Sequence, residues 1–203
     1  MSKLNIQPVV YDGRRLNEVG DRVVSVFYPL FDDYKINDEL GFLDLDSIVL
    51  RDGESDPSQR ARIVGPDFPR FLSNYGSPVL GVTSITSTRS KNDGWVYGIA
   101  SKNYNAAYVS TARPEFDSAE SNIHVERLII EALHELGHVF ALQHHESPKR
   151  TSNRKSCPMD TSHAEKARSG IISWGEYLSQ RNPEAFCREC YGQLGISIQT
   201  ERK

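Results

Sequence analysis

The apolar positions of the first half of the chain follow the spacings of strands and helices in alternation. An apolar run over residues 6–11 predicts a strand. A helix is predicted over 14–27, where apolar side chains recur every three or four residues. These positions are Leu16, Val19, Val23 and Val26. A strand followed directly by an amphipathic helix is typical of the start of a layered arrangement of helices and sheet.

Composition predicts the next elements. Weak alternation over 41–50 predicts a second strand, and the polar stretch 52–65, which contains Pro and Gly, predicts a loop. A short helix is expected around 68–75. Runs with strand composition then cover 78–87, 94–101 and 106–111. The short connections between them favour at least one antiparallel pair, and an edge strand here could either pair with an extended peptide or simply face solvent.

The longest predicted helix runs to about Phe140. Ser118 and Ser121 are both plausible N-caps for it. Its apolar positions surround two histidines, so the helix can be buried and still present these side chains to a cleft. His124 lies ten residues before His134, too far along the helix to share an ion with it, and is predicted to be structural.

The end of this helix carries the most informative motif of the chain, HELGHVFALQH. His134 and His138 are four residues apart, so both imidazoles lie on one helix face and can reach one ion. His144 would lie about 240° further round an ideal helix, so the chain must turn after His138 for it to join them. Glu135 points elsewhere and can act as a general base. The spacing predicts a zinc-hydrolase site.

A second group of metal-binding residue types follows. It comprises His145, Cys157, Cys187 and Cys190. One histidine and three cysteines can form a closed tetrahedral zinc site, with the Cys-x-x-Cys pair as its tight end. His163 is an alternative fourth ligand, but we favour His145 because His144 beside it would tie both metal sites to one short turn. A redox pair is less favoured, since no thioredoxin-like strand and helix precede the motif.

Size and charge exclude few function classes. The 203 residues suit a single domain, and a net charge of −3 gives no sign of a polyanionic partner. The basic segment 147–155 has no interleaved aromatic residues and is predicted to be a solvated loop. No secretory apolar region or membrane span is evident, so we expect a cytoplasmic protein. In a reducing compartment, three clustered cysteines favour metal binding over disulfides.

The sequence HELGHVFALQHH, followed by Cys-Pro-Met and Cys-x-x-Cys, resembles the archaemetzincins, a branch of the metzincin zinc peptidases. The specific motifs cover 134–190. The resemblance implies an α+β, metzincin-like zincin fold in a single metalloprotease domain, 1–203. A mixed twisted sheet and the active-site helix would form an N-terminal lobe, 1–144. A small, mostly irregular or helical C-terminal lobe would cover 145–203.

The resemblance also implies roles for individual residues. Catalytic zinc would be bound by His134, His138 and His144, with Glu135 as general base and proton shuttle. Met159 would lie in the Met-turn, the methionine-containing turn beneath the metal. A second, structural zinc would be held at position 145 and by the three cysteines. Two zinc ions per chain are therefore expected.

Three departures from the archaemetzincin pattern matter. Position 145 is histidine rather than cysteine, which still suits zinc. Position 141 is alanine rather than glycine. A left-handed turn out of the helix costs a residue with a Cβ about 1–2 kcal/mol, so Ala141 predicts a turn that is strained or differently shaped. The gaps from His145 to Cys157 and from Met159 to Cys187 are also longer, which would reshape the cleft.

The residues and the resemblance together predict a monomeric zinc-dependent peptidase that acts on peptides or proteins. Glu135 would take a proton from a zinc-bound water as the water attacks the peptide carbonyl. The alternative is a catalytically inactive zinc-binding or peptide-binding protein, which Ala141 favours and Glu135 disfavours. A zinc-ribbon-like nucleic-acid binder would depend on the cysteines and the basic loop alone.

Overall fold

The computed structural model describes most of the chain. The described residues are 2–11, 15–45, 49–51, 61–65, 67–88, 95–113, 116, 122–145, 149–151 and 153–196.

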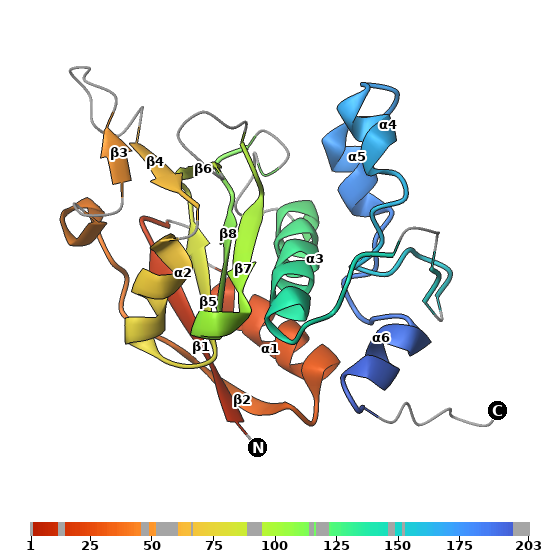
Figure 1. Cartoon of the computed structure of the whole chain (residues 1–203), viewed down its shortest axis with the longest axis horizontal. Helices are drawn as coiled ribbons and strands as arrows, with labels where there is room; N and C mark the ends of the chain where they lie inside the picture. Colours follow the sequence, from red (N-terminus) through yellow and green to blue (C-terminus); the bar gives the residue numbers. More distant parts are fainter. Residues whose placement is uncertain are drawn as a thin grey trace.

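A five-stranded mixed sheet forms the centre of the molecule (Figure 1). Its strands, in spatial order, are β2 (Phe31–Ile36), β1 (Ser2–Val9), β5 (Val79–Thr83), β8 (Ala106–Ser110) and β7 (Gly98–Ser101). All neighbours pair in parallel except β7, which is antiparallel to β8. One edge of this sheet is therefore formed by β7.

Helices cover both faces of this sheet. They are α1 (Leu16–Phe27) and α3 (Asn122–Val139) on one face, and α2 (Asp67–Leu72), continued by the 3₁₀ turn η2 (Ser73–Tyr75), on the other. Successive side chains of a strand point to opposite faces, so β8 contributes side chains to the hydrophobic core on each face of the sheet. Ala107 and Val109 pack in the core with α1 and α3, while Ala106 and Tyr108 pack with α2.

A smaller sheet of three strands lies beside the main one (Figure 1). It contains β3 (Val49–Arg51), β4 (Ala61–Val64) and β6 (Thr86–Thr88). The first pair is antiparallel and the second parallel. An isolated bridge joins Thr88 to Trp95, just before β7. A 3₁₀ turn, η3 (Lys102–Tyr104), connects β7 to β8.

The C-terminal part of the chain lies beside α3, on the side away from the main sheet (Figure 1). It consists of irregular segments and three short helices, α4 (Ala164–Arg168), α5 (Trp174–Ser179) and α6 (Arg188–Gln193). Phe186 packs its ring edge-on against Phe27 of α1, at 5.3 Å between centroids. The expected fold class, a mixed sheet with helices, is confirmed; the division into lobes at residue 144 stays a prediction.

Two predicted elements differ from the observed ones. The first half of the strand predicted over 41–50 is wrong, because η1 (Phe42–Leu45) is a 3₁₀ turn in which the Gly41 N–H donates to the Asp44 carboxylate. Part of the loop predicted over 52–65 is also wrong, since β4 falls within it, while 52–60 lies outside the described residues.

Other predicted boundaries shift without changing the element. The strand predicted over 78–87 divides into β5 and β6, which belong to different sheets. The long helix ends one residue before Phe140, and its two N-cap candidates, Ser118 and Ser121, lie outside the described residues. The predicted antiparallel pair is confirmed by β7 and β8.

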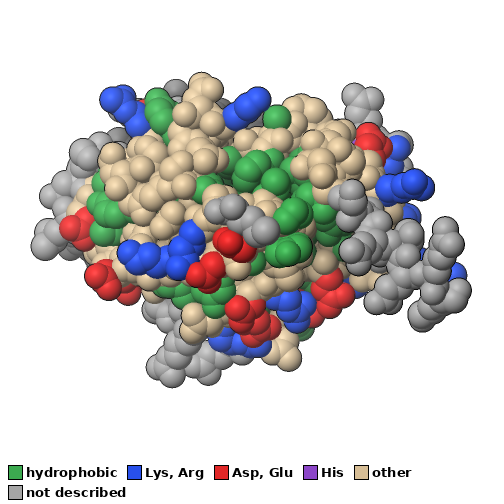
Figure 2. Space-filling view, turned by 90° about the horizontal axis from the view of Figure 1, so that it is seen from below, with side chains coloured by type: hydrophobic (Ala, Val, Ile, Leu, Met, Phe, Trp, Pro, Cys, Tyr) green, Lys and Arg blue, Asp and Glu red, His purple; other side chains and the backbone are tan. Residues whose placement is uncertain are grey.

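One face of the molecule mixes charged and apolar side chains. Figure 2 shows hydrophobic side chains gathered near the centre of this face, with acidic and basic side chains scattered around them. Because both signs lie close together, this face does not present the single-sign field that attracts a polyanion. Within the described part of the chain, no helix has both the length and the apolar character needed to cross a membrane.

Candidate metal centre

Three histidine side chains converge at the end of α3. The Nε2 atom of His134 lies 3.2 Å from that of His138 and 3.2 Å from that of His144, and the last two are 2.9 Å apart. Nitrogen ligands about 2.0–2.1 Å from a tetrahedral zinc would be about 3.3 Å from one another. The three histidines predicted as ligands are thus brought together at nearly the spacing that one zinc ion requires.

Backbone carbonyls orient two of these rings. The Nδ1–H of His134 donates to the carbonyl oxygen of Pro158 at 2.9 Å, and that of His138 donates to Leu142 at 3.0 Å. With the proton on Nδ1, each Nε2 carries a lone pair directed at the others. Such bonds fix the tautomer and the ring orientation of metal-binding histidines.

Both helix histidines are held in the neutral form. Burial lowers the pKa of His134 well below its usual 6.5, and the nearby guanidinium of Arg181 lowers it further. Burial also lowers the pKa of His138. Imidazole nitrogens are the ligands that divalent zinc prefers, and the two helix histidines are kept in the neutral form that binds a metal, so the donor set fits such an ion.

The turn after α3 places His144. Ala141 has a φ of 66°, in the left-handed region. Its N–H donates to the carbonyl of His138 at 3.0 Å, and the N–H of Leu142 donates to that of Gly137 at 2.9 Å. These two bonds form a Schellman motif, which is usually built with glycine at the position of Ala141. The sequence left open a strained left-handed turn or a turn of another shape at Ala141. The structure has the strained left-handed turn.

Met159 is fully buried in the core that α3 forms with the C-terminal part of the chain. Its sulfur faces Gly137, where an added Cβ would come within 2.7 Å of it. Its carbonyl accepts a hydrogen bond from the N–H of His145 at 3.0 Å. The segment around Met159 therefore contacts both the helix and the residue that follows His144, while its role as a Met-turn stays a prediction.

Glu135 lies between α3 and the edge strand β7, and only 7% of it is exposed. A Cβ added to Gly98 would lie 2.7 Å from Glu135 Cγ and 2.4 Å from the carbonyl oxygen of Tyr108. The absence of a side chain on Gly98 thus lets the carboxylate lie against the strand, beside the three histidines.

A cavity of about 610 Å³ contains these groups. Among the residues that line it are Trp95, Gly98, His134, Glu135, Trp174 and Arg181. They come from the strand edge, from α3 and from the C-terminal helices. The cavity is therefore a cleft between the sheet and the C-terminal part of the chain, with His134, His144 and Glu135 in its wall.

Sequence reasoning missed a buried ion pair in this cleft. Arg181 Nη1 lies 3.1 Å from Glu131 Oε1, with 3% and 5% of the two side chains exposed. Burial raises the pKa of Glu131, and Arg181 opposes this rise. Arg181 also donates to the carbonyl of Asp160 at 3.0 Å and to the hydroxyl of Tyr177. Glu131 lies one helical turn before Glu135, and this spacing could have pointed to it. Nothing in the sequence around Arg181 could have done the same.

The second predicted ligand group also comes together. His145 Nε2 lies 3.2 Å from Cys190 Sγ and 3.3 Å from Cys187 Sγ. Cys157 Sγ is 3.7 Å from Cys190 Sγ, close to the distance of about 3.8 Å between thiolates on one tetrahedral zinc. All four ligand atoms lie within 4.8 Å of one another. His163, the alternative ligand, instead precedes α4 and is not part of the group.

The thiols of this cluster share their protons. Cys157 donates to Cys187, which raises the pKa of Cys157 to about 12. The pKa of Cys187 is lowered, because it accepts hydrogen bonds from Cys157 and Cys190. Three ionised thiols in contact would repel one another, so a cation is needed to hold all three as thiolates.

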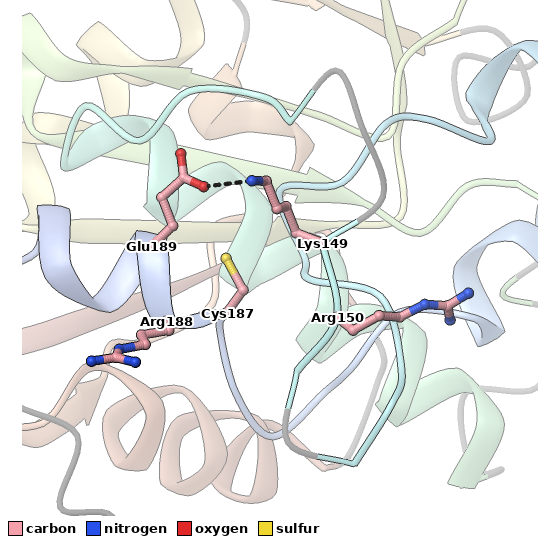
Figure 3. Close-up of a pocket in the computed structure, with 5 residues that line it drawn as sticks. All are labelled: Lys149, Arg150, Cys187, Arg188 and Glu189. Atoms are coloured by element: carbon pink, nitrogen blue, oxygen red, sulfur yellow. Dashed lines mark ion pairs between the residues drawn. The ribbon is translucent and has the colours of Figure 1, made fainter.

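One side of the cysteine cluster faces a pocket of about 510 Å³ (Figure 3). Cys187 points into it, and the ion pair of Lys149 with Glu189, at 3.0 Å, lies across its mouth. The other three ligands do not line this pocket. All four side chains of the cluster are buried, with no more than 6% of any of them exposed.

His124 makes contacts that fit its predicted structural role. It is 3% exposed, its Nδ1 lies 2.8 Å from the carbonyl oxygen of Phe116, and its Nε2 lies 3.3 Å from the hydroxyl of Tyr11. It therefore joins α3 to the segments around Tyr11 and Phe116, away from the metal-binding end of the helix.

Imidazoles that converge beside a buried carboxylate, in a cleft along a sheet edge, are an arrangement found in zinc metallopeptidases. Comparison with known proteins gives the family. Residues 74–195, more than half of the chain, match peptidase family M54. The chain therefore belongs to this family.

Individual relatives agree with this assignment. An archaemetzincin of Pyrococcus abyssi is 35% identical over 147 residues, which are 63% of this chain and 68% of that protein. An archaemetzincin of Thermococcus kodakarensis is 36% identical over 93 residues, 42% of this chain. The chain matches only half of the length of that relative, 50%. The resemblance drawn from the sequence motifs is thus confirmed.

A solved structure shows the same fold. The crystal structure of archaemetzincin from Archaeoglobus fulgidus, complexed with malonate, superimposes with a TM-score of 0.60 and 22% sequence identity. The match covers 95% of this chain and 99% of that one. At this identity the similarity is evidence for the fold alone.

Proposed function

We propose that the chain is a zinc-dependent peptidase that hydrolyses peptide bonds in peptides or proteins. The observation that carries this proposal is the convergence of three imidazoles at the wall of the cleft that also contains Glu135. His134, His138 and His144 are the proposed ligands. When bound there, zinc polarises a peptide carbonyl and lowers the pKa of a coordinated water from about 15.7 to about 7.

Glu135 is the proposed general base. It accepts the proton of the attacking water and then delivers that proton to the nitrogen of the leaving amine. Its position supports this role, because the carboxylate is buried in the cleft wall against Gly98.

The edge strand β7 is the proposed docking site for the substrate backbone. Its outer edge is not paired with another strand of the main sheet, and Gly98 at its start lines the same cleft as Glu135. An extended peptide can add to such an edge through backbone hydrogen bonds. This would bring the peptide's carbonyl groups alongside the three histidines.

The second site is proposed to hold a structural zinc, so that each chain binds two ions. Support comes from the chemistry of His145, Cys157, Cys187 and Cys190, which form a complete tetrahedral donor set without an open position. Three thiols that are kept as metal ligands require a reducing compartment, so we propose a cytoplasmic location. We also propose a single domain and a monomer.

Two measurements test these proposals. Metal analysis of the purified protein should give two zinc ions per chain, and Cys187→Ser should lose one of them while the other remains. Glu135→Gln should retain both ions and lose cleavage of a peptide library by at least about 100-fold. A matched control is Glu126→Gln, an exposed glutamate on the same helix, which should cleave normally.

The alternative, an inactive zinc-binding protein, gives a different pattern. It would bind two zinc ions and peptides but show no cleavage that depends on Glu135. Equal rates of peptide cleavage by zinc-loaded wild type and zinc-loaded Glu135→Gln would contradict the proposed mechanism. A protein that binds no zinc at either site would contradict both proposals.

A further inference from the structure

Both tryptophans of the chain lie in the cleft that contains the histidines. The chain has only two, Trp95 and Trp174, and they are 79 positions apart in the sequence. Their rings lie 5.4 Å apart between centroids, nearly perpendicular at 78°. Trp95 precedes β7, whereas Trp174 begins α5 in the C-terminal part of the chain. The pair therefore spans the cleft from one side to the other.

Buried tyrosines hold the two indoles in place. Tyr97 lies 4.9 Å from Trp95 and 5.8 Å from Trp174, and Tyr177 lies 5.6 Å from Trp174. The guanidinium of Arg113 lies 3.9 Å over the Trp95 ring. Tyr97 and Tyr177 are 8% and 5% exposed, but both tryptophans are half-buried. The indoles thus keep free surface toward the cleft on a rigid aromatic support.

Two ion pairs include charged residues that line the cleft. Arg181 and Glu131 form the buried ion pair described above, and Arg168 pairs with Glu165 at the rim. The charges of each pair largely cancel. Between these pairs, the indoles of Trp95 and Trp174 line the cleft.

We propose that Trp95 and Trp174 form the wall of a specificity subsite that receives an aromatic or large apolar side chain of the peptide, next to the bond that is cleaved. The inference rests on the proposed peptidase function and specifies its substrate class. Stacking and edge-to-face contacts with the indoles, together with burial of apolar area, favour such side chains over small or charged ones.

The two tryptophans also supply the assay. Because no other tryptophan exists in the chain, selective tryptophan excitation reports on this wall alone. Zinc-loaded Glu135→Gln protein is titrated with four matched peptides that differ at one central residue, Phe, Leu, Ala or Asp. The Phe and Leu peptides should change the emission and bind at least about tenfold more tightly than the Ala and Asp peptides.

Substitutions at Trp174 test whether this residue causes the preference for the Phe peptide. Trp174→Ala should abolish the preference for Phe over Ala while the zinc content is retained. Trp174→Phe should keep the preference, because it keeps an aromatic ring. Ile171→Ala, at a residue that is 72% exposed in the same segment, is the matched control and should behave as wild type.

Each result separates this inference from the proposed function. A wild type that binds the Phe peptide selectively but cleaves nothing would contradict the peptidase function and leave the subsite supported. Equal binding of all four peptides, or tightest binding of the Asp peptide, would overturn the subsite. If Trp174→Ala does not fold, Trp95→Phe and Trp174→Phe serve instead, because each leaves one tryptophan. If the Phe peptide changes the emission of neither variant, the proposed subsite is overturned as well.

Discussion

Ala141 carries the clearest local strain beside the metal centre. Its left-handed φ of 66° is required by the two hydrogen bonds that close the helix, and its side chain is exposed, so the methyl group contributes little packing. The residue therefore bears a conformational cost in order to bring His144 back to the other histidines.

Ala141→Gly should stabilise the protein by about 0.5–1 kcal/mol. Relief of about 1–2 kcal/mol of left-handed strain exceeds the added chain entropy of glycine in the unfolded state. Urea unfolding of the two proteins at equal zinc content measures the difference. Ala185→Gly, at an alanine without a positive φ, should have the opposite sign. A destabilised Ala141→Gly would show that the turn is not strained.

Gly98→Ala should lower kcat by at least about 100-fold and leave the zinc content unchanged. The new methyl group would displace Glu135 or the β8 backbone, whereas the three histidines are untouched. Peptide cleavage and metal analysis of the same sample measure both quantities. Gly192→Ala, where an added Cβ meets nothing within 4 Å, is the control. A fully active Gly98→Ala would remove the proposed role of this contact.

At the scale of elements, α3 is the rigid part of the site. It carries two histidines and Glu135, and its far side is buried against β8 and α1. Its position and its ligands could be predicted from the sequence, because helical periodicity and the spacing of His134 and His138 are local properties. The same is true of the Cys-x-x-Cys pair.

Other elements could not be predicted, for physical reasons. The parallel strand β2 contains Asp32, Asp33 and Lys35, whose exposed side chains on a sheet edge leave no apolar alternation to read. Trp95 and Trp174, or Glu131 and Arg181, are brought together only by tertiary packing across 50 or more residues. No local pattern carries such information. The residues that form the cleft wall could therefore be identified only from the structure.

The buried ion pair between α3 and the C-terminal part of the chain should be costly to break. Glu131→Gln leaves the Arg181 guanidinium buried without a counter-charge and should destabilise the fold by about 3–5 kcal/mol. Urea unfolding measures this. Replacing both partners, Glu131→Leu with Arg181→Met, should recover most of the loss.

The exposed pair of Glu165 with Arg168 is the comparison. Its side chains are 80% and 63% exposed, so Glu165→Gln should change stability by no more than about 0.5 kcal/mol. If Glu131→Gln were equally harmless, the buried pair would not be what fastens α3 to the C-terminal helices.

At the scale of the whole molecule, the two proposed metal sites meet at consecutive residues. His144 belongs to one and His145 to the other, and the N–H of His145 is held by Met159. The sheet side of the cleft, the C-terminal helices and the cysteine cluster are therefore joined through one short turn. Loss of either ion should lower the affinity of the other site for zinc.

The metal-free protein should lose stability as the pH falls below about 6.5. Burial lowers the pKa of His134 and His138 in the fold, so below that pH the unfolded chain binds protons that the folded chain does not. Each histidine contributes a slope of up to about 1.4 kcal/mol per pH unit. Urea unfolding of chelator-treated protein between about pH 7.5 and 5 measures it.

His134→Gln should flatten this dependence, because one of the two neutral imidazoles is gone. A metal-free protein whose stability is constant, or rises, as the pH falls through this window would contradict the burial argument. Zinc should move the onset of the loss to lower pH, since protons must then compete with the ion.

The edge strand β7 has a consequence for inhibitor chemistry. Only every second amide of an extended peptide faces the strand with which it pairs, and the amides between face away. Single N-methylation at successive positions of a bound peptide should therefore weaken binding in an alternating pattern. The tolerated positions are those at which a protease-resistant backbone can be introduced without loss of affinity, and they would map the substrate register on β7 residue by residue.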